Sequence, residues 1–265
     1  MKRGSFWSWL WVAIGGLYFF LPLLSTFDFS LRAKKGILTF VAYENIFKDP
    51  QFWSTIRFSL VIALFTVFFS ILLVVPTVYW IRLRLPQLRM LVEFISMLSY
   101  VIPAIVLVFG LIRVFSGSPF YLTNSYFGTY VLLVAAYVVL TLPFSFRAID
   151  TGMSAIDVRS LTEAAQSLGA GWGTILFRVI FPNLKVAILS SVFLTLATVI
   201  GEYTMASFII GLKSFGPYMS LVGQNKTYES SSITIISFLM TWALMMVIQL
   251  FNRTKANNGT HSGGR

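Results

Sequence analysis

Runs of about twenty apolar residues recur along this chain of 265 residues, and they constrain its fold more than any other feature. A helix needs about 20 apolar residues to cross the hydrocarbon core of a bilayer. The chain is 57% hydrophobic and 11% charged, whereas soluble domains are roughly 45–50% apolar and about 25% charged. The sequence therefore excludes a water-soluble enzyme and predicts an all-α, polytopic membrane protein.

Six transmembrane helices are expected from these runs. A cleavable signal peptide is the alternative for the first run, but this run exceeds the usual apolar core of a signal peptide and no small-residue cleavage site follows it. The expected spans cover residues 7–27, 58–81, 90–112, 126–146, 186–210 and 233–251. They predict one transmembrane domain over residues 1–253 and a disordered, hydrophilic tail over residues 254–265.

The distribution of Lys and Arg predicts the orientation of these spans. With a cytoplasmic N-terminus, twelve basic residues fall on inner segments and eight on outer segments. Five of those eight lie in the long first outer connection, where the positive-inside rule is weak. Both termini are therefore expected in the cytoplasm.

The composition also excludes several kinds of site. The chain has no cysteine, and its one histidine, His261, lies in the hydrophilic tail. Disulfides, thiolate metal sites and intramembrane histidine chemistry are therefore excluded, and no catalytic or metal site is expected. The net charge of +11 comes from residues that flank the apolar runs. This pattern favours contact with lipid headgroups and disfavours nucleic-acid binding.

The inner connection over residues 147–185 is the longest cytoplasmic segment, and a short helix is predicted within it. Two capping boxes overlap there, because Ser154 and Ser160 are each followed three residues later by an acidic side chain. Helix-forming residues fill positions 161–168. Gly169 then stands where a residue in the left-handed conformation would end the helix.

The apolar residues of this predicted helix fall on one face, spaced i, i+3, i+4 and i+7: they are Leu161, Ala164, Ala165 and Leu168. A face with two alanines is small, so it suits a groove in a partner protein. A helix lying on the inner leaflet is the alternative. A second amphipathic piece over residues 174–181 ends at Pro182.

The spacing of this segment carries a family resemblance. Glu163-Ala164-Ala165, Gly169 and Pro182 stand in the pattern EAA-x3-G-x9-I-x-L-P, with Val179 and Phe181 at its two other apolar positions. This pattern resembles the EAA loop of permease subunits of binding-protein-dependent ABC importers. Ile102-Pro103 and Gly201-Glu202-Tyr203 resemble the branch that serves polyamines, ferric iron and related solutes. The chain is thus similar to a type I (MetI-like) permease, and within that fold to the spermidine/putrescine branch.

The resemblance implies the partners and the location of the chain. The segment with Leu161, Glu163, Ala164, Ala165, Leu168, Gly169 and Pro182 would be the coupling helix and its flank, seated on one of two ATP-binding-cassette ATPase subunits. A second permease, with a heterodimer favoured, and an extracytoplasmic solute-binding protein would complete a bacterial inner-membrane importer. The chain has no G-x-x-x-x-G-K-[ST] motif, so it is not expected to hydrolyse ATP. We expect it to bind no cofactor itself, with ATP and Mg on the ATPase subunits.

Polar residues of the fifth span are candidates for the substrate pathway. Ser191, Thr195, Thr198 and Glu202 are spaced 4, 3 and 4 and are predicted to share one helix face. The three hydroxyl residues could equally hold helices together. A carboxylate at membrane depth is a functional candidate by default. An ion pair with Arg113 or an interhelical hydrogen bond is the alternative role for Glu202.

A carboxylate such as Glu202 would suit a cation, so a polyamine is the expected solute. Ferric iron, thiamine, phosphonate and oxyanions are the alternatives within the same importer class. A stand-alone secondary transporter is disfavoured because internal repeats are not evident. An intramembrane enzyme is disfavoured because Glu202 has no partner in sequence for nucleophilic chemistry.

Overall fold

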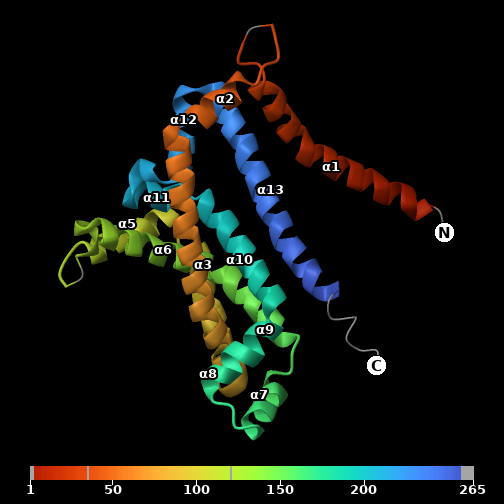
Figure 1. The fold of residues 1–265 in the computed structure, drawn as a ribbon, viewed down its shortest axis with the longest axis vertical. Helices are drawn as coiled ribbons and strands as arrows, with labels where there is room; N and C mark the ends of the chain where they lie inside the picture. Colours follow the sequence, from red (N-terminus) through yellow and green to blue (C-terminus); the bar gives the residue numbers. More distant parts are fainter. Residues whose placement is uncertain (1–2, 35, 120, 258–265) are drawn as a thin grey trace. The chain divides into compact units, whose positions relative to one another are not determined.

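The computed structural model describes residues 3–34, 36–119 and 121–257 (Figure 1). Within these ranges the chain is helical, and its one β-type pairing is an isolated bridge between Lys34 and Ile37. The chain divides into two compact units. Residues 1–54 and 218–243 form the first, and residues 55–217 and 244–265 form the second.

Four helices are long and apolar enough to cross a membrane: α1 (Arg3–Ser30), α3 (Pro50–Arg84), α6 (Tyr126–Ser154) and α13 (Thr227–Asn257). Two further spans are possible if each of two bent helix pairs crosses once. Four of the six expected spans thus correspond to single helices, and the other two overlap the two bent pairs. The other helices and turns are α2 (Val41–Lys48), η1 (Pro86–Leu88), α4 (Arg89–Val101), α5 (Ala104–Phe115), η2 (Leu122–Asn124), α7 (Val158–Ser167), α8 (Trp172–Thr174), η3 (Ile175–Ile180), α9 (Phe181–Asn183), α10 (Lys185–Ile200), α11 (Thr204–Ile209), η4 (Gly211–Lys213) and α12 (Phe215–Asn225).

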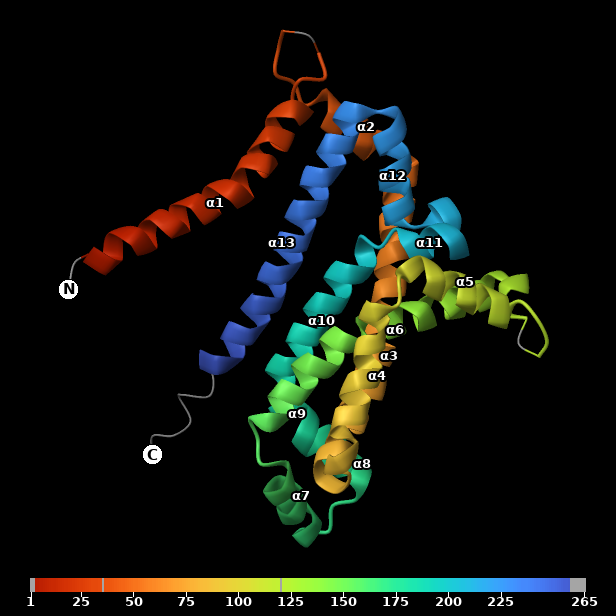
Figure 2. The same cartoon turned by 180° about the vertical axis from the view of Figure 1, so that it is seen from behind.

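The third span is broken, whereas a continuous run over residues 90–112 was expected. The segments Pro86–Val101 and Ala104–Phe115 meet at 101° (Figure 2). Ile102 is extended, with φ −82° and ψ 119°, and Pro103 begins α5. A proline disfavours helical backbone in the residue before it and cannot donate to the preceding turn, so the helix ends here.

The fifth span also differs from expectation. The segment Trp172–Asn183 meets α10 at 77°. Helix α10 then ends at Ile200, with Gly201 as its C-cap, and the short helix α11 follows. The expected span over residues 186–210 is therefore interrupted, and Glu202 lies in the interruption instead of on a continuous helix.

The ends of two other helices correct the sequence-based boundaries. Helix α3 begins at Pro50, eight residues before the expected start at position 58. Helix α13 continues to Asn257, so residues 254–257 of the expected disordered tail are helical. The rest of that tail, including His261, lies outside the described residues.

The first unit is held together by side chains from α1, α2, α12 and α13. Ser30 and Tyr43 share a 2.8 Å hydrogen bond, and the amide of Asn45 donates to Glu229 over 3.1 Å. The Tyr218 hydroxyl donates to Asp49 over 2.7 Å. Burial and the Asp49 carboxylate raise the pKa of this hydroxyl, which therefore stays protonated and able to donate.

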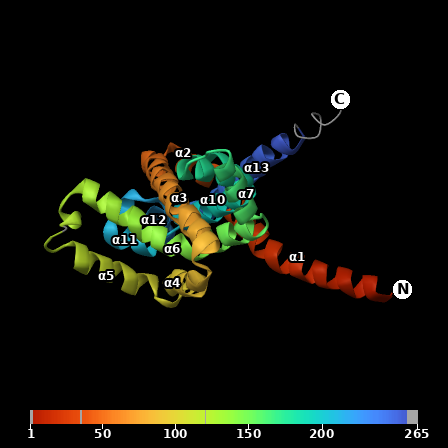
Figure 3. The same ribbon diagram turned by 90° about the horizontal axis from the view of Figure 1, so that it is seen from below.

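The second unit contains the core on which the inner segment rests. Helices α6 and α10 pack along each other in it. Helix α3 crosses them in the view of Figure 3, and its Ser70 hydroxyl lies 3.4 Å from that of Thr141 on α6. Helices α6 and α10 approach closely at Gly152, where a Cβ atom would clash with the Cβ of Ala187. Two apolar clusters fill the unit, and the one at the ends of α3 and α6 near Ile149 and Met153 also includes Val158 of α7.

An ionic cluster joins the same ends of α3, α4 and α6. The Asp150 carboxylate of α6 accepts from Arg82 over 2.6 and 2.7 Å and from Arg89 over 2.8 Å. Arg82 also donates to the backbone oxygen of Asp150 over 2.9 Å. The Asp150 side chain is only 12% exposed. Water therefore has little access to the carboxylate and could not replace the hydrogen bonds and positive charge of the two guanidinium groups.

Replacing Asp150 by asparagine is expected to destabilise the chain by about 3 kcal/mol, because it leaves two guanidinium groups without their counter-charge at a mostly buried site. The midpoint of thermal unfolding of the purified chain in detergent should fall by several degrees. Glu44→Gln is the matched control, since it breaks an exposed ion pair with Lys48 inside one helix and should leave the midpoint unchanged. Equal shifts for the two variants would contradict the structural role of Asp150.

Candidate functional site

The site begins with α7, the helix of the inner connection, which is capped by Asp157. The Asp157 carboxylate accepts from the Ser160 hydroxyl over 2.7 Å and from the Ser160 amide over 3.1 Å. These hydrogen bonds, the hydroxyl first, hold the pKa of Asp157 below its usual value. The carboxylate therefore stays ionised at neutral pH and stabilises the N-terminus of α7.

The predicted capping boxes are wrong in detail. Ser154 ends α6 and donates to the Thr151 backbone oxygen, and Ser160 lies inside the first turn of α7. Glu163 is not part of a cap, because it pairs with Arg159 one turn away over 2.8 Å. Asp157 is itself a favoured N-cap residue type, so the signal for the actual cap was present in the sequence.

The end of α7 confirms the predicted role of Gly169. Its φ is +78°, in the left-handed region. The Gly169 amide donates to Gln166 over 2.8 Å, and the Ala170 amide donates to Ala165 over 3.0 Å. This pair of bonds is the Schellman motif, which ends a helix at a glycine.

The predicted single apolar face of α7 is divided by the structure. Ala165 is buried with Val158 and Thr162 against the chain's own core. Ala164 is exposed, Leu161 is half-buried and Leu168 is 89% exposed. Only the second group is accessible to another protein. We call Leu161, Ala164 and Leu168 the outer face of α7.

Two contacts fix α7 and the segment after it to α3. The hydroxyls of Thr162 and Tyr79 share a 3.0 Å hydrogen bond, and both residues are buried. Trp172 packs against Trp80, with 4.8 Å between ring centroids, and the guanidinium of Arg84 lies 5.7 Å from the Trp172 ring. The backbone after α7 is therefore attached to the same helix that carries Arg82 of the ionic cluster.

Pro182 lies one residue before the end of its helical segment at Asn183, which agrees with the helix end expected there. The segment passes through the π-helical turn η3, in which the Phe181 amide donates to the Leu176 oxygen five residues back. A proline at 182 has no N–H and its ring excludes the carbonyl four residues earlier. The wider π turn accommodates this proline inside the helical segment.

The four predicted pathway residues differ in burial and in their hydrogen-bond partners. Ser191 and Thr195 are buried, and the Thr195 hydroxyl lies 3.4 Å from that of Ser145 on α6. Thr198 is half-buried and donates to the Leu194 oxygen over 2.8 Å. These positions match the alternative role of hydroxyls that hold helices together.

Glu202 caps α11 and is not on the α10 face. Its carboxylate accepts from the amides of Met205 and Ala206 over 2.9 and 3.0 Å and from the Tyr137 hydroxyl over 3.1 Å. The interhelical hydrogen bond expected as one alternative is thus present. The ion pair with Arg113 is not among the contacts of the described residues. Gly201, a helix-ending residue, was the sequence signal for this break.

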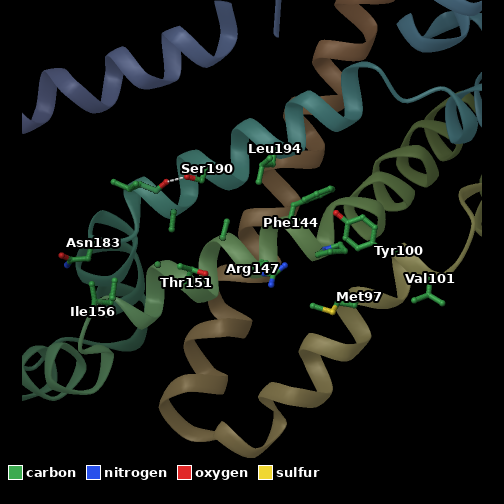
Figure 4. Close-up of a pocket in the computed structure, with 16 residues that line it drawn as sticks. Met97, Tyr100, Val101, Phe144, Arg147, Thr151, Ile156, Asn183, Ser190 and Leu194 are labelled. Carbon is green, nitrogen blue, oxygen red and sulfur yellow. Dashed lines mark hydrogen bonds between the residues drawn. The ribbon is translucent and has the colours of Figure 1, made fainter. Parts of the chain in front are cut away.

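A groove of 960 Å³ lies between α4, α6 and the start of α10 (Figure 4). Its walls are mostly apolar, and they use the face of α10 with Val186, Ser190 and Leu194. Arg147 of α6 lines it as well. Arg147 begins the predicted inner connection, where a basic residue indicates topology, and its sequence context did not predict a place in a groove.

Comparison with known proteins identifies the family. Residues 78–254 match the model of the "Binding-protein-dependent transport system inner membrane component". A ferric transport system permease of Haemophilus influenzae is 32% identical over 143 residues, which are 54% of this chain but only 21% of that protein. The chain therefore spans about a fifth of the length of that relative.

Two further relatives match along most of both chains. A permease of Salmonella typhimurium named for 2-aminoethylphosphonate transport is 28% identical, covering 88% of this chain and 89% of its own. The spermidine/putrescine permease of Haemophilus influenzae is 28% identical, covering 80% of each.

A solved structure supports the same fold. A bacterial ABC transporter involved in the import of the acidic polysaccharide alginate matches with a TM-score of 0.72 and 14% sequence identity, covering 94% of this chain and 95% of that one. The break after Val101, the inner helix α7 and the bent entry into α10 all lie within the residues that the family model matches. The chain belongs to the inner-membrane components of binding-protein-dependent transport systems and has the type I (MetI-like) ABC importer permease fold.

Proposed function

We propose that this chain forms half of the translocation pathway of an ATP-driven solute importer and that α7 transmits the work of ATP hydrolysis to it. The observation that carries the proposal is the geometry of α7. One face is buried on α3 and α6, and the outer face of Leu161, Ala164 and Leu168 is left for a partner. Because one face of α7 is packed on α3 and α6, a partner that binds the outer face and moves would carry the spanning helices with it.

The proposed partners are two ATP-binding-cassette subunits, which bind ATP and Mg, and a second permease, with a heterodimer favoured. An extracytoplasmic binding protein would deliver the solute. Both termini and α7 would lie in the cytoplasm, as the distribution of basic residues favours. Glu163 pairs with Arg159 on the exposed surface of α7, on the side of the helix that Gln166 shares three residues later.

The solute is proposed to be small, and a polyamine is the candidate that Glu202 favours. The half-buried carboxylate of Glu202 lies in the break between α10 and α11. The Glu202 carboxylate accepts three hydrogen bonds, which explain its role as a cap of α11. Binding of a cationic solute would be a second role of the same carboxylate. Relatives named for ferric iron, phosphonate and sulfate keep those solutes as alternatives.

Ala164→Trp is expected to uncouple the importer while the chain folds normally, because Ala164 is exposed. Transport should fall about tenfold or more, equivalent to roughly 1.4 kcal/mol of docking energy. The measurement is solute uptake and ATPase stimulation in proteoliposomes. Gln166→Trp is the control, since Gln166 is also exposed but lies away from the outer face; it should transport normally.

Ala165→Trp provides the contrast. Ala165 is buried in the inner cluster, so a large side chain there should overpack the core and lower the yield of folded protein. Normal uptake and normal ATPase stimulation by Ala164→Trp would remove the outer face from the coupling role.

Glu202→Gln separates the cap from the pathway. The amide oxygen of glutamine can still accept from one of the two α11 amides, so most of the folded yield and the basal ATP hydrolysis should be retained. If the carboxylate serves a cation, spermidine uptake should fall about tenfold. Tyr137→Phe removes a hydrogen bond to Glu202 without changing charge and should leave uptake near normal. Full spermidine uptake by a well-expressed Glu202→Gln complex would refute the cationic pathway.

A further inference from the structure

The groove between α4, α6 and α10 presents one charged side chain among apolar walls. Met97 and Val101 of α4, Phe144 of α6 and Leu194 of α10 form those walls. Arg147 lies between them, and Figure 4 shows its guanidinium directed into the space between α4 and α6. None of the sixteen residues that line the groove, all of them described, is acidic.

Arg147 differs from Arg82 and Arg89 in having no counter-charge. Arg82 and Arg89 both pair with Asp150, one turn further along α6. Among the described residues Arg147 takes part in no ion pair and no hydrogen bond, and its side chain is exposed. A guanidinium beside apolar walls in a membrane-spanning region is costly unless an anion or water satisfies its five donors.

Two hydroxyl groups line the groove with Arg147. Thr151 follows it by four residues on α6 and so shares its helix face. Tyr100 of α4 is exposed in the same groove and lies within electrostatic range of the guanidinium. The planar fork of an arginine binds two oxygens of a phosphate-type group at once, and hydroxyls can supply further donors.

We propose that this groove is an oxyanion-binding site centred on Arg147, with the hydroxyls of Thr151 and Tyr100 as neutral donors. A phosphate-type group could come from an anionic phospholipid, whose acyl chain would lie along the apolar walls, or from a free anion such as a transported solute. The chemistry at Arg147 is the same in both cases. The proposal does not depend on ATP-driven transport, because it concerns binding to this chain.

Native mass spectrometry of the full-length chain in a neutral detergent tests the lipid source. The probe is phosphatidylglycerol, with phosphatidylcholine, whose zwitterionic headgroup has no net charge, as the comparison. Arg147→Gln should weaken phosphatidylglycerol binding about tenfold or more, because a hydrogen-bonded charge pair is lost. Arg147→Lys keeps the positive charge but not the planar fork, so its affinity for phosphatidylglycerol should lie between those of the wild type and Arg147→Gln. Arg57→Gln is the matched control: Arg57 is exposed on α3 outside the groove, and its loss should leave phosphatidylglycerol binding unchanged.

Thermal unfolding with millimolar phosphate or sulfate tests the free-anion source, against sodium chloride at equal ionic strength. Stabilisation of the wild type but not of Arg147→Gln, with displacement of phosphatidylglycerol, assigns the site to a free oxyanion. Binding of phosphatidylglycerol that phosphate and sulfate do not displace assigns it to lipid. The proposal is overturned if Arg147→Gln changes neither measurement, or if Arg57→Gln weakens binding equally. Neither measurement involves the ATPase, so a negative result here leaves the coupling role of α7 to its own test.

Discussion

The ion pairs of Asp150 with Arg82 and Arg89 are the interaction on which the functional end of this molecule depends. They join α3, α4 and α6 at one level, within 2.6–2.8 Å and with Asp150 mostly shielded from water. Directly beside them, the apolar cluster of Ile149 and Met153 takes up the buried face of α7. A charge cluster that fixes three helices and a core that holds a fourth element give a rigid base for α7, the helix that we propose to couple the chain to an ATPase.

Such rigidity matters because a coupling helix can only move the pathway if it cannot slide over its own chain. The buried hydrogen bond between Tyr79 and Thr162 and the Trp80–Trp172 contact oppose that sliding. The breaks after Val101 and Ile200 lie elsewhere in the same unit and leave places where backbone can bend. The fold thus combines a fixed inner end with interrupted spans, which suits a protein that must alternate between two openings.

Local signals in the sequence predicted much of this fold. The apolar runs, the α7 segment and Gly169 as its end depend on neighbouring residues alone. The structure confirms the α7 segment, Gly169 and four of the runs as single helices, whereas the third and fifth runs are broken. Which side of α7 is buried could not be read in this way: Ala164 and Ala165 are chemically identical, and only the position of α3 and α6 decides between them. Glu202 was misplaced because helical spacing was extended across Gly201, and Arg147 was missed because a single basic residue signals topology and binding alike.

The central claim is that the outer face of α7 is cytoplasmic and covered by an ATPase subunit. Since the chain has no cysteine, a single Leu168→Cys variant can be labelled with a membrane-impermeant maleimide. The account predicts labelling in inside-out vesicles and not in intact cells, with protection when the ATPase subunits are bound, while Gln166→Cys stays reactive with or without them. Labelling of Leu168→Cys in intact cells, or equal reactivity with and without the ATPase subunits, would contradict it.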